Sequence, residues 1–296
     1  MISVPKGNSQ NKLAKLLHSV GNDVTERILT NLEGKMLRVI ICGALGRMGR
    51  EVIYKISQRE DIELVGAIES LQHPLLGKET EKGIKVGSHL ENVVERDSII
   101  IEFTTPPATL EHLRIAEKKG IPMVIGTTGF KEEEYERIKR ASNTIPIIIS
   151  SNMSIGINLL YSIVKQITKI LGENFDKEII ETHHRNKKDA PSGTAQRIAQ
   201  IIAEVEDRSL SEVGVYGRKG IKNEIRSKKE IGIHAIRGGS VVGEHTVLFA
   251  GEEERLEITH RAESRGIFAR GAILAAEFLV GKEKGLYDFQ DVLGLK

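Results

Sequence analysis

From residue 37 onward, short apolar runs alternate with amphipathic stretches at helical spacing. The first run, 37–42, leads through a glycine-rich turn at 43–49 into a helical pattern at 50–56. The alternation continues with apolar runs at 62–68, 98–101, 122–125 and 145–149 and helical stretches at about 108–119 and 131–142. Strands separated by helices of this length pair in parallel through right-handed crossovers. The pattern therefore predicts an α/β domain with a doubly wound parallel sheet.

After residue 152 the periodicity changes. Helical patterns at 155–171 and 194–205 flank a strand at 177–181. Strands then follow one another without intervening helices, at 231–237, 240–249 and 254–260. Such runs joined by tight turns favour an antiparallel or mixed sheet, and hence a second domain of the α+β class. A helix at 265–280 and a tail at 286–294 are expected to return to the first domain.

These patterns divide the chain into three parts: an N-terminal helical extension at 1–35, a dinucleotide-binding domain at 36–153 completed by 264–296, and a second domain at 154–263. Apolar residues of the extension fall at the spacing of two short amphipathic helices, and we assign it no catalytic part. It is an appendage or reflects an upstream start, because Met36 directly precedes the first strand. A transit peptide is disfavoured by three acidic residues, Asp23, Glu26 and Glu33.

The charge balance narrows the possible partners. The 43 basic and 41 acidic residues nearly cancel to a net charge of +2, which disfavours a general nucleic-acid surface.

Cys42 is the one cysteine, so an internal disulfide framework is excluded and a reducing compartment is expected. No apolar stretch approaches the roughly 20 residues that cross a bilayer, and the N-terminus lacks a hydrophobic signal core. We expect a cytoplasmic protein with no nucleic-acid or membrane partner.

A G-x-x-G-x-x-G turn joins the first strand to its helix through three glycines, Gly43, Gly46 and Gly49. Glycine lets the backbone approach a pyrophosphate, and the helix N-terminus supplies N–H groups and a favourable dipole. Glu69 ends the second strand, where a carboxylate accepts hydrogen bonds from the adenosine ribose. This combination predicts a Rossmann-like dinucleotide-binding domain over a purely structural turn. Ser70, where an arginine would pair with a 2′-phosphate, favours NADH over NADPH, although Arg47 could still reach a phosphate.

Polar motifs follow three later strands of the same sheet. Gly126-Thr-Thr-Gly129 and Ser150-Ser-Asn-Met153 come after the fourth and fifth apolar runs, and Phe103-Thr104 comes after the third. Ligands bind open α/β sheets at the carboxyl ends of their strands. The hydroxyl and amide groups of these motifs suit a nicotinamide carboxamide and ribose. Ordinary turn chemistry is the alternative reading of the same residues.

A strongly basic segment, 181–194, leads into the helix at 194–205. It reads Glu-Thr-His-His-Arg-Asn-Lys-Lys-Asp-Ala-Pro-Ser-Gly-Thr, with five basic side chains interrupted by Asn186. Backbone N–H groups at a helix start attract anions, and imidazole titrates near neutrality, so the segment predicts an anion site with proton transfer. A solvated basic turn is the alternative. A metal-dependent hydrolase using His183, His184 and Asp189 is disfavoured, because the helical spacing of metal ligands is absent.

These motifs together resemble the 4-hydroxy-tetrahydrodipicolinate (dihydrodipicolinate) reductase family of lysine and diaminopimelate biosynthesis. The resemblance spans about 37–295. It rests on GALGRMG at 43–49, FT at 103–104, VIGTTGF at 124–130, ETHHR at 181–185, KKDAPSGT at 187–194, VGEHT at 242–246, RLEITH at 255–260 and GLYDFQDVL at 285–293. It implies NAD(P)H-dependent reduction of (2S,4S)-4-hydroxy-2,3,4,5-tetrahydrodipicolinate to (S)-2,3,4,5-tetrahydrodipicolinate with release of water.

The resemblance also implies roles for individual residues. His183 is similar to the family's acid/base residue and Lys187 to its proton donor, with no metal. The residues similar to its substrate-binding set are His184, Gly193 and Thr194. Those similar to its cofactor-binding set are Gly43, Ala44, Leu45, Gly46, Arg47, Met48, Glu69, Gly126, Thr127, Thr128, Ser150, Ser151, Asn152 and Met153. The small-molecule substrate is a dicarboxylate and the cofactor is NADH, NADPH or both, with NADH favoured.

By the same resemblance, 154–263 is a substrate-binding and oligomerisation domain of a homotetramer. Thr105 and Ser70 stand where some members of the family carry arginine, which puts a preference for NADPH in doubt. A non-catalytic dinucleotide-responsive regulator with the same fold is the alternative function. The presence of both proton-transfer residues argues against it. Away from this segment, His245 and His260 are expected to be structural, Arg237 could touch substrate, and His112 has no surrounding constellation.

Overall fold

A computed structural model describes residues 36–221 and 224–296, which form two compact units. The first unit contains the described residues up to Ile149 together with Ala272–Asp288. The second contains Ser150–Gly271, apart from the two residues not described, and Phe289–Lys296. The helices expected within 1–35 lie outside the described residues.

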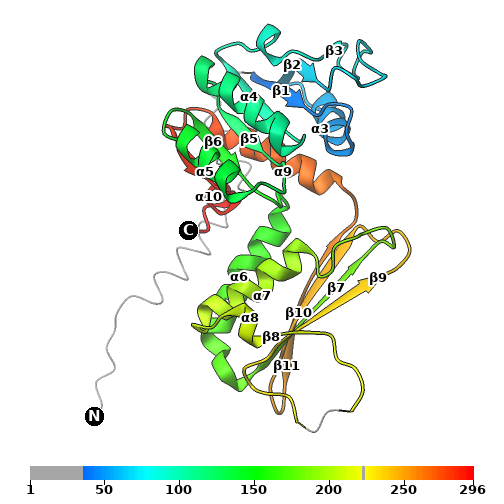
Figure 1. Cartoon of the computed structure of the whole chain (residues 1–296), viewed down its shortest axis with the longest axis vertical. Helices are drawn as coiled ribbons and strands as arrows, with labels where there is room; N and C mark the ends of the chain where they lie inside the picture. The colour runs from blue at the N-terminus through cyan, green and yellow to red at the C-terminus, as the bar shows by residue number, and fades with distance from the viewer. Residues whose placement is uncertain (1–35, 222–223) are drawn as a thin grey trace. The chain divides into compact units, whose positions relative to one another are not determined.

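The first unit is built on a seven-stranded sheet in the order β12-β6-β5-β4-β1-β2-β3 (Figure 1). Every neighbouring pair in it is parallel, which confirms the doubly wound α/β class. The strands are β1 (Leu37–Cys42), β2 (Ile62–Ile68), β3 (Val86–Gly87), β4 (Ser98–Glu102), β5 (Met123–Ile125), β6 (Pro146–Ile149) and β12 (Gly285–Tyr287). Parallel strands are buried on both faces, and β4 and β5 are buried at every residue.

Helices cover both faces of this sheet. The helices are α3 (Arg47–Ser57), α4 (Pro106–Lys119), α5 (Glu132–Ala141), the single-turn η2 (Leu90–Asn92) and α9 (Gly266–Leu279), which ends in this unit. Leu113 of α4 and Ile138 of α5 join Ile40, Ile100 and Met123 of the strands in one buried cluster. Apolar residues spaced every third or fourth position give each helix the face that packs on the strands.

The second unit is built on a five-stranded mixed sheet in the order β11-β10-β7-β9-β8. The strands are β7 (Asp176–His183), β8 (Gly214–Tyr216), β9 (Ile231–Arg237), β10 (Gly243–Ala250) and β11 (Arg255–Ala262). β10 pairs antiparallel with β7 and β11, whereas β9 pairs parallel with β7 and β8. The α+β class predicted for this part of the chain is therefore confirmed.

The two longest helices of this unit lie on one side of its sheet (Figure 1). The unit contains the helices α6 (Ile155–Leu171), η3 (Gly172–Asn174), α7 (Gly193–Val205), α8 (Leu210–Val213) and α10 (Phe289–Leu293). Burial alternates along β7 and β10, so that Ile179 and Phe249 are buried and pack with Ile198 of α7. The alternate residues, including Ile180 and Leu248, are half-buried on the opposite face.

The C-terminal segment differs from its expected place. We expected all of 264–296 to complete the first unit, but α9 begins in the second unit, and α10 and the last residues belong to the second. Ala272–Asp288, which contains the end of α9 and β12, stays with the first unit, where β12 pairs in parallel with β6. α10 contacts α6, and the Gln290 side-chain amide donates to the backbone oxygen of Asn158 at 2.9 Å. Across the described residues, no helix is both long and apolar enough to span a bilayer.

Candidate functional site

The glycine turn after β1 is packed too tightly for any side chain. Gly43 has φ +79°, and a Cβ there would lie 2.4 Å from the backbone oxygen of Phe103. A Cβ on Gly49 would lie 2.1 Å from the backbone oxygen of Gly43. Gly46 caps α3 without a side-chain hydrogen bond, so the helix presents its first N–H groups beside this turn. The turn fits the pyrophosphate of a dinucleotide, which needs close backbone approach and N–H donors.

Glu69 holds this turn from the end of β2. One carboxylate oxygen accepts a hydrogen bond from the Leu45 N–H at 3.0 Å, and the other accepts one from the Ser70 N–H at 2.9 Å. A carboxylate has about four acceptor positions, so two remain for ribose hydroxyls. The structure thus brings the predicted ribose acceptor to the predicted pyrophosphate turn. The same side chain also fixes the backbone of the turn.

The ends of β4 and β5 meet beside the same turn. A Cβ on Gly126 would lie 2.1 Å from the ring of Phe103, so the residue after β5 must be glycine for this ring to fit. The Thr104 N–H donates to the hydroxyl of Thr127 at 3.1 Å, and Thr127 is buried. Thr128 is exposed. The first unit therefore gathers the residues predicted at 43–48, 69 and 126–128 along the carboxyl ends of β1, β2 and β5.

The last predicted cofactor motif, 150–153, belongs to the second unit. The Ser150 hydroxyl donates to the backbone oxygen of Asn152 at 2.9 Å, and Ser151 is exposed. The Asn152 side-chain amide donates to the hydroxyl of Thr194 at 3.1 Å. Met153 is buried, with its backbone close to Gly271. This motif therefore contacts the predicted substrate-binding segment directly.

His183 ends β7 and is held by a buried carboxylate two residues earlier. Its Nδ1 donates to Glu181 at 2.6 Å. Both oxygens of Glu181 also accept from the Arg237 guanidinium at 2.8 Å, and one accepts from the Ser192 N–H at 3.0 Å. Glu181 is fully buried, and period-two alternation along β7 puts it on the same face as His183. With Nδ1 engaged, Nε2 is the nitrogen of His183 that can exchange a proton.

The electrostatics of this pair follow from burial and from Arg237. Burial lowers the pKa of His183 below its usual value, against the opposing effect of the Glu181 carboxylate. For Glu181, burial alone would raise the pKa, but hydrogen bonds from Arg237 and His183 lower it overall. The pair therefore places a negative carboxylate behind a mostly neutral imidazole. Such an imidazole can act as a base at neutral pH and as an acid once it is protonated.

The other basic residues of the segment precede the start of α7 along the chain. The Lys187 ammonium lies 2.9 Å from a carboxylate oxygen of Asp189, which is largely exposed, and Lys187 lowers the pKa of that carboxyl. His184 is half-buried and its backbone oxygen accepts from the Lys187 N–H at 3.1 Å. The Ser192 hydroxyl caps α7 by accepting from the Ala195 N–H at 3.2 Å. Gly193 is exposed and Thr194 half-buried, so the first turn of α7 is open to an anion.

Two residues near His183, His245 and Arg237, make contacts that the sequence-based prediction of the site did not include. The Nε2 of His245 lies 3.0 Å from the Ser192 hydroxyl, and its ring packs edge-on against His183 with 5.2 Å between centroids. Burial lowers the pKa of His245 to about 3, so this ring stays neutral. Arg237, expected at most to touch substrate, pairs with Glu181. The period-two pattern of β10 marks His245 as inward-facing, but only strand pairing reveals its neighbours.

The structure corrects the expectation for His112. Its Nδ1 lies 2.8 Å from a carboxylate oxygen of the buried Glu102, so it does belong to a constellation. Within the described part of the chain, Cys42, Glu102 and His112 form a group with metal-ligand atoms within 4.8 Å of one another. His183, His184 and Asp189 do not form such a group among those residues. The geometry of the basic segment therefore gives the metal-dependent hydrolase no support.

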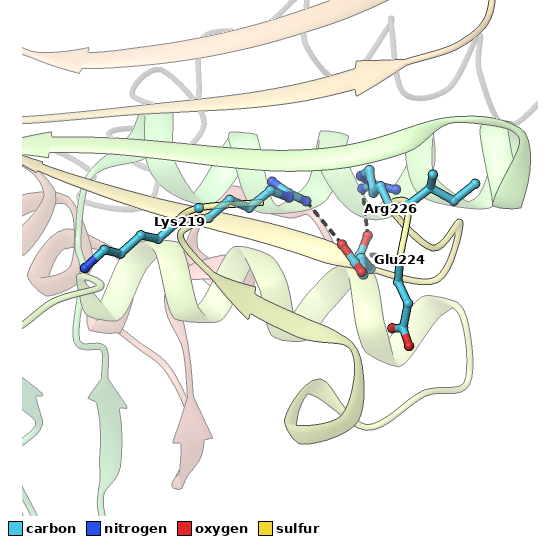
Figure 2. Close-up of a pocket in the computed structure, with 7 residues that line it drawn as sticks. Lys219, Glu224 and Arg226 are labelled. Atoms are coloured by element: carbon cyan, nitrogen blue, oxygen red, sulfur yellow. Dashed lines mark hydrogen bonds and ion pairs between the residues drawn. The ribbon is translucent and has the colours of Figure 1, made fainter. Parts of the chain in front are cut away.

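A cavity of about 270 Å³ lies in the second unit, away from the predicted residues (Figure 2). It is lined by Arg218, Lys219, Gly220, Glu224, Ile225, Arg226 and Glu230. Both arginines are already paired with the carboxylate of Glu178, Arg218 at 2.8 Å and Arg226 at 3.0 Å. Lys219 and Glu224 point away from each other in Figure 2. Since its arginines are neutralised, this cavity does not present the charge that a dicarboxylate requires.

The fold and these two sets of residues define a nicotinamide-dinucleotide-dependent oxidoreductase. Comparison with known protein families identifies the family of oxidoreductases to which the chain belongs. The protein-family model described as "Dihydrodipicolinate reductase, N-terminus" matches residues 37–153, and the family model described as "Dihydrodipicolinate reductase, C-terminus" matches residues 156–293. The chain belongs to the dihydrodipicolinate reductase family, which confirms the resemblance noted from its motifs.

Individual relatives agree with this assignment. The chain is 47% identical over 268 residues to the 4-hydroxy-tetrahydrodipicolinate reductase of Syntrophobacter fumaroxidans, covering 88% of this chain and 100% of that protein. It is 48% identical over 268 residues to the one from Desulfotalea psychrophila, covering 88% and 99%. The solved structure of dipicolinate-bound dihydrodipicolinate reductase from Paenisporosarcina sp. TG-14 matches with a TM-score of 0.69 at 28% identity, covering 86% and 98%.

Proposed function

We propose a division of labour for the reaction that this chain catalyses, the reduction of 4-hydroxy-tetrahydrodipicolinate to tetrahydrodipicolinate with release of water in lysine biosynthesis. The first unit holds the nicotinamide dinucleotide, and the second holds the dicarboxylate and moves protons. The observation that carries this proposal is the buried pair of Glu181 and His183, beside Lys187 and the open N-terminus of α7.

We assign cofactor binding to 43–48, Glu69 and 126–128 of the first unit, and also to 150–153, which belong to the second unit. When bound, the dinucleotide supplies the hydride. The chain's part is to hold it: the glycine turn and the start of α3 accommodate the pyrophosphate, and Glu69 accepts from the ribose. We propose a preference for NADH, because the Glu69 carboxylate repels a 2′-phosphate and Ser70 offers it no positive charge. The reducing cytoplasm is the proposed compartment, in keeping with the free buried thiol of Cys42.

The substrate half consists of His184, Gly193 and Thr194 together with Lys187 of the basic segment. A dicarboxylate needs fixed positive charge and N–H donors. Backbone N–H groups at the first turn of α7 supply donors and a favourable dipole for one carboxylate. Lys187 is held by an exposed carboxylate, Asp189, which a bound anion can replace as the partner of the ammonium. Asn152 connects to this set through its hydrogen bond to Thr194.

His183 and Lys187 transfer the protons of the reaction. The leaving hydroxyl takes up a proton and departs as water while a neighbouring ring carbon gives one up. After hydride addition that carbon takes a proton back, so the reaction consumes one hydride and one proton overall. His183 exchanges protons through Nε2 while Glu181 fixes its tautomer and stabilises its charged form. Lys187 donates from a flexible side chain with three N–H groups. Glu181 and Arg237 act through His183 and are positioning residues.

The direct test measures turnover. Purified protein is mixed with freshly generated substrate, and the loss of reduced-cofactor absorbance is followed with NADH and with NADPH. We expect turnover with a higher kcat/KM for NADH. His183→Gln and Lys187→Ala should lose kcat by roughly 10²-fold or more, with unchanged affinity for NADH. Lys188→Ala, an exposed neighbour, is the matched control.

Three results would count against parts of this proposal. Near-full turnover in either variant removes the assigned proton-transfer roles. A protein that binds NADH tightly but never turns over would be the dinucleotide-responsive regulator. A higher kcat/KM with NADPH would reverse the cofactor preference.

We also propose a homotetramer formed through the second unit. The face of its sheet opposite the helices carries Ile180, Leu248 and Ile236, and Ile236 is 49% exposed. An apolar sheet face of this kind is stabilised by burial against a second copy. Analytical ultracentrifugation should give a mass of about four chains. Ile236→Lys should shift the mass towards smaller species, and a monomeric wild type at micromolar concentration would contradict the proposal.

A further inference from the structure

A buried charged cluster lies beneath the strand ends of the first unit, and the reaction as described makes no use of it. Glu102 is the last residue of β4 and is fully buried. Its carboxylate lies 2.8 Å from Nδ1 of His112, which sits on α4 and is mostly buried. An ionised carboxylate in a protein interior is stable only when paired and hydrogen-bonded. Glu102 therefore requires the partners that surround it.

These partners reach the loops that hold the dinucleotide. The Thr104 hydroxyl donates to Glu102, and the Thr104 N–H donates to the hydroxyl of Thr127 at 3.1 Å. The buried hydroxyl of Thr109, on α4, donates to the same Thr127 oxygen at 2.9 Å. A continuous hydrogen-bond path thus runs from the carboxylate to the end of β5. Thr127 lies within the motif assigned to the nicotinamide end of the cofactor.

The cluster also includes a residue of β1, a further strand whose end borders the cofactor site. Cys42, the last residue of β1, precedes the glycine turn. The Cys42 sulfur lies within 4.8 Å of a carboxylate oxygen of Glu102, and burial together with this carboxylate raises the pKa of the thiol well above its usual range. The ends of β1, β4 and β5 are thus tied to one carboxylate. These strand ends leave little slack, because Phe103 touches the backbone of both Gly43 and Gly126.

We propose that Glu102 and His112 are positioning residues for the dinucleotide, holding Thr104, Thr127 and the glycine turn in the arrangement that binds it. The proposal rests on the proposed function of the first unit. A metal site is the competing interpretation of the same residues. We favour the network, because the Nδ1 of His112 already contacts Glu102 directly, at 2.8 Å. Removing the charge should displace the loops without altering any group that touches substrate.

The test measures cofactor binding in the full-length protein without substrate. NADH fluorescence titrations give its Kd for wild type, Glu102→Gln and Thr109→Val. Glutamine presents an N–H₂ group to a hydrogen-bond donor, either Thr104 or His112. Thr109→Val removes, at nearly constant volume, one of the two hydrogen bonds that the Thr127 hydroxyl accepts. We expect Kd and the KM for NADH to rise about tenfold, as coupling through such networks typically allows, while the KM for substrate stays unchanged. Glu136→Gln, an exposed carboxylate on α5, is the matched control.

The split between cofactor and substrate parameters separates positioning from general destabilisation. Loss of thermal stability with unchanged Kd for NADH would overturn the proposal and leave Glu102 a structural residue. Thr109→Val keeps the test available if Glu102→Gln fails to fold. Stoichiometric metal in the purified protein would also overturn it in favour of a metal site. A wild type that binds NADH but shows no turnover would refute the proposed function while leaving this binding test intact.

Discussion

Replacing Glu181 by glutamine tests the most heavily connected residue of the second unit. In the native protein its carboxylate accepts from His183 at 2.6 Å, from Arg237 at 2.8 Å and from the Ser192 N–H at 3.0 Å. Glutamine keeps one acceptor oxygen and places an N–H₂ group where a donor stands. Either His183 or Arg237 then loses its partner. The shape of the side chain is preserved, so the change is electrostatic.

The structure sets the size of the effect. Breaking a buried charged pair costs about 3–5 kcal/mol, and we expect the lower end, because Arg237 is 19% exposed and regains some solvent. General acid–base catalysis contributes about 10²–10⁴-fold to rate. Because the remaining oxygen can still accept from Nδ1 of His183, we expect kcat to fall by about 10²-fold. The pKa of His183, already lowered by burial, falls further once the opposing carboxylate charge is gone.

The assay is the pH dependence of kcat at saturating cofactor and substrate. The limb that reports loss of protonated His183 should move to lower pH in Glu181→Gln, with little change in the Kd for NADH. Glu257→Gln, an exposed carboxylate on β11 of the same unit, should keep the wild-type profile. Arg237→Lys should fall between the two, because lysine cannot make the bidentate contact. A Glu181→Gln enzyme with full kcat and an unshifted limb would refute the reasoning.

Three further predictions follow from the geometry. Gly126→Ala places a Cβ 2.1 Å from the Phe103 ring and should weaken NADH binding more than substrate binding, as separate titrations would reveal. Ser192→Ala removes the cap of α7 and the partner of His245 and should lower the free energy of unfolding by about 1–2 kcal/mol in urea titrations, whereas an unchanged midpoint would contradict it. Burial alone would raise the pKa of Glu178, but hydrogen bonds from Arg218, His234 and Arg226 hold it at about 2. Its stabilising effect is therefore complete above its usual pKa of 4.5 and disappears as the pH falls towards 2, a loss that Glu178→Gln should flatten in thermal scans.

The sequence was a good guide wherever the signal was local. Apolar runs separated by helical stretches predict parallel strands, and the carboxyl ends of such strands share one edge, so Gly43, Glu69 and Gly126 could be assigned to one region without coordinates. The mixed sheet of the second unit followed from consecutive strands in the same way. Local spacing also placed Ser192 and Gly193 at the start of α7, because proline, serine and glycine commonly begin helices.

The sequence therefore encodes locally the elements, the two classes of fold and the residues that end each strand, because periodicity and turn chemistry act over a few residues. Tertiary structure alone decided which of these residues share a contact. Arg237 reaches Glu181 because β9 pairs with β7, and His112 reaches Glu102 because α4 packs on β4's face of the sheet. The C-terminal tail divides between the two units because β12 pairs with β6 in the first unit, whereas Gln290 donates a hydrogen bond to Asn158 in the second. These contacts depend on strand register and helix packing between distant segments, which no local pattern encodes.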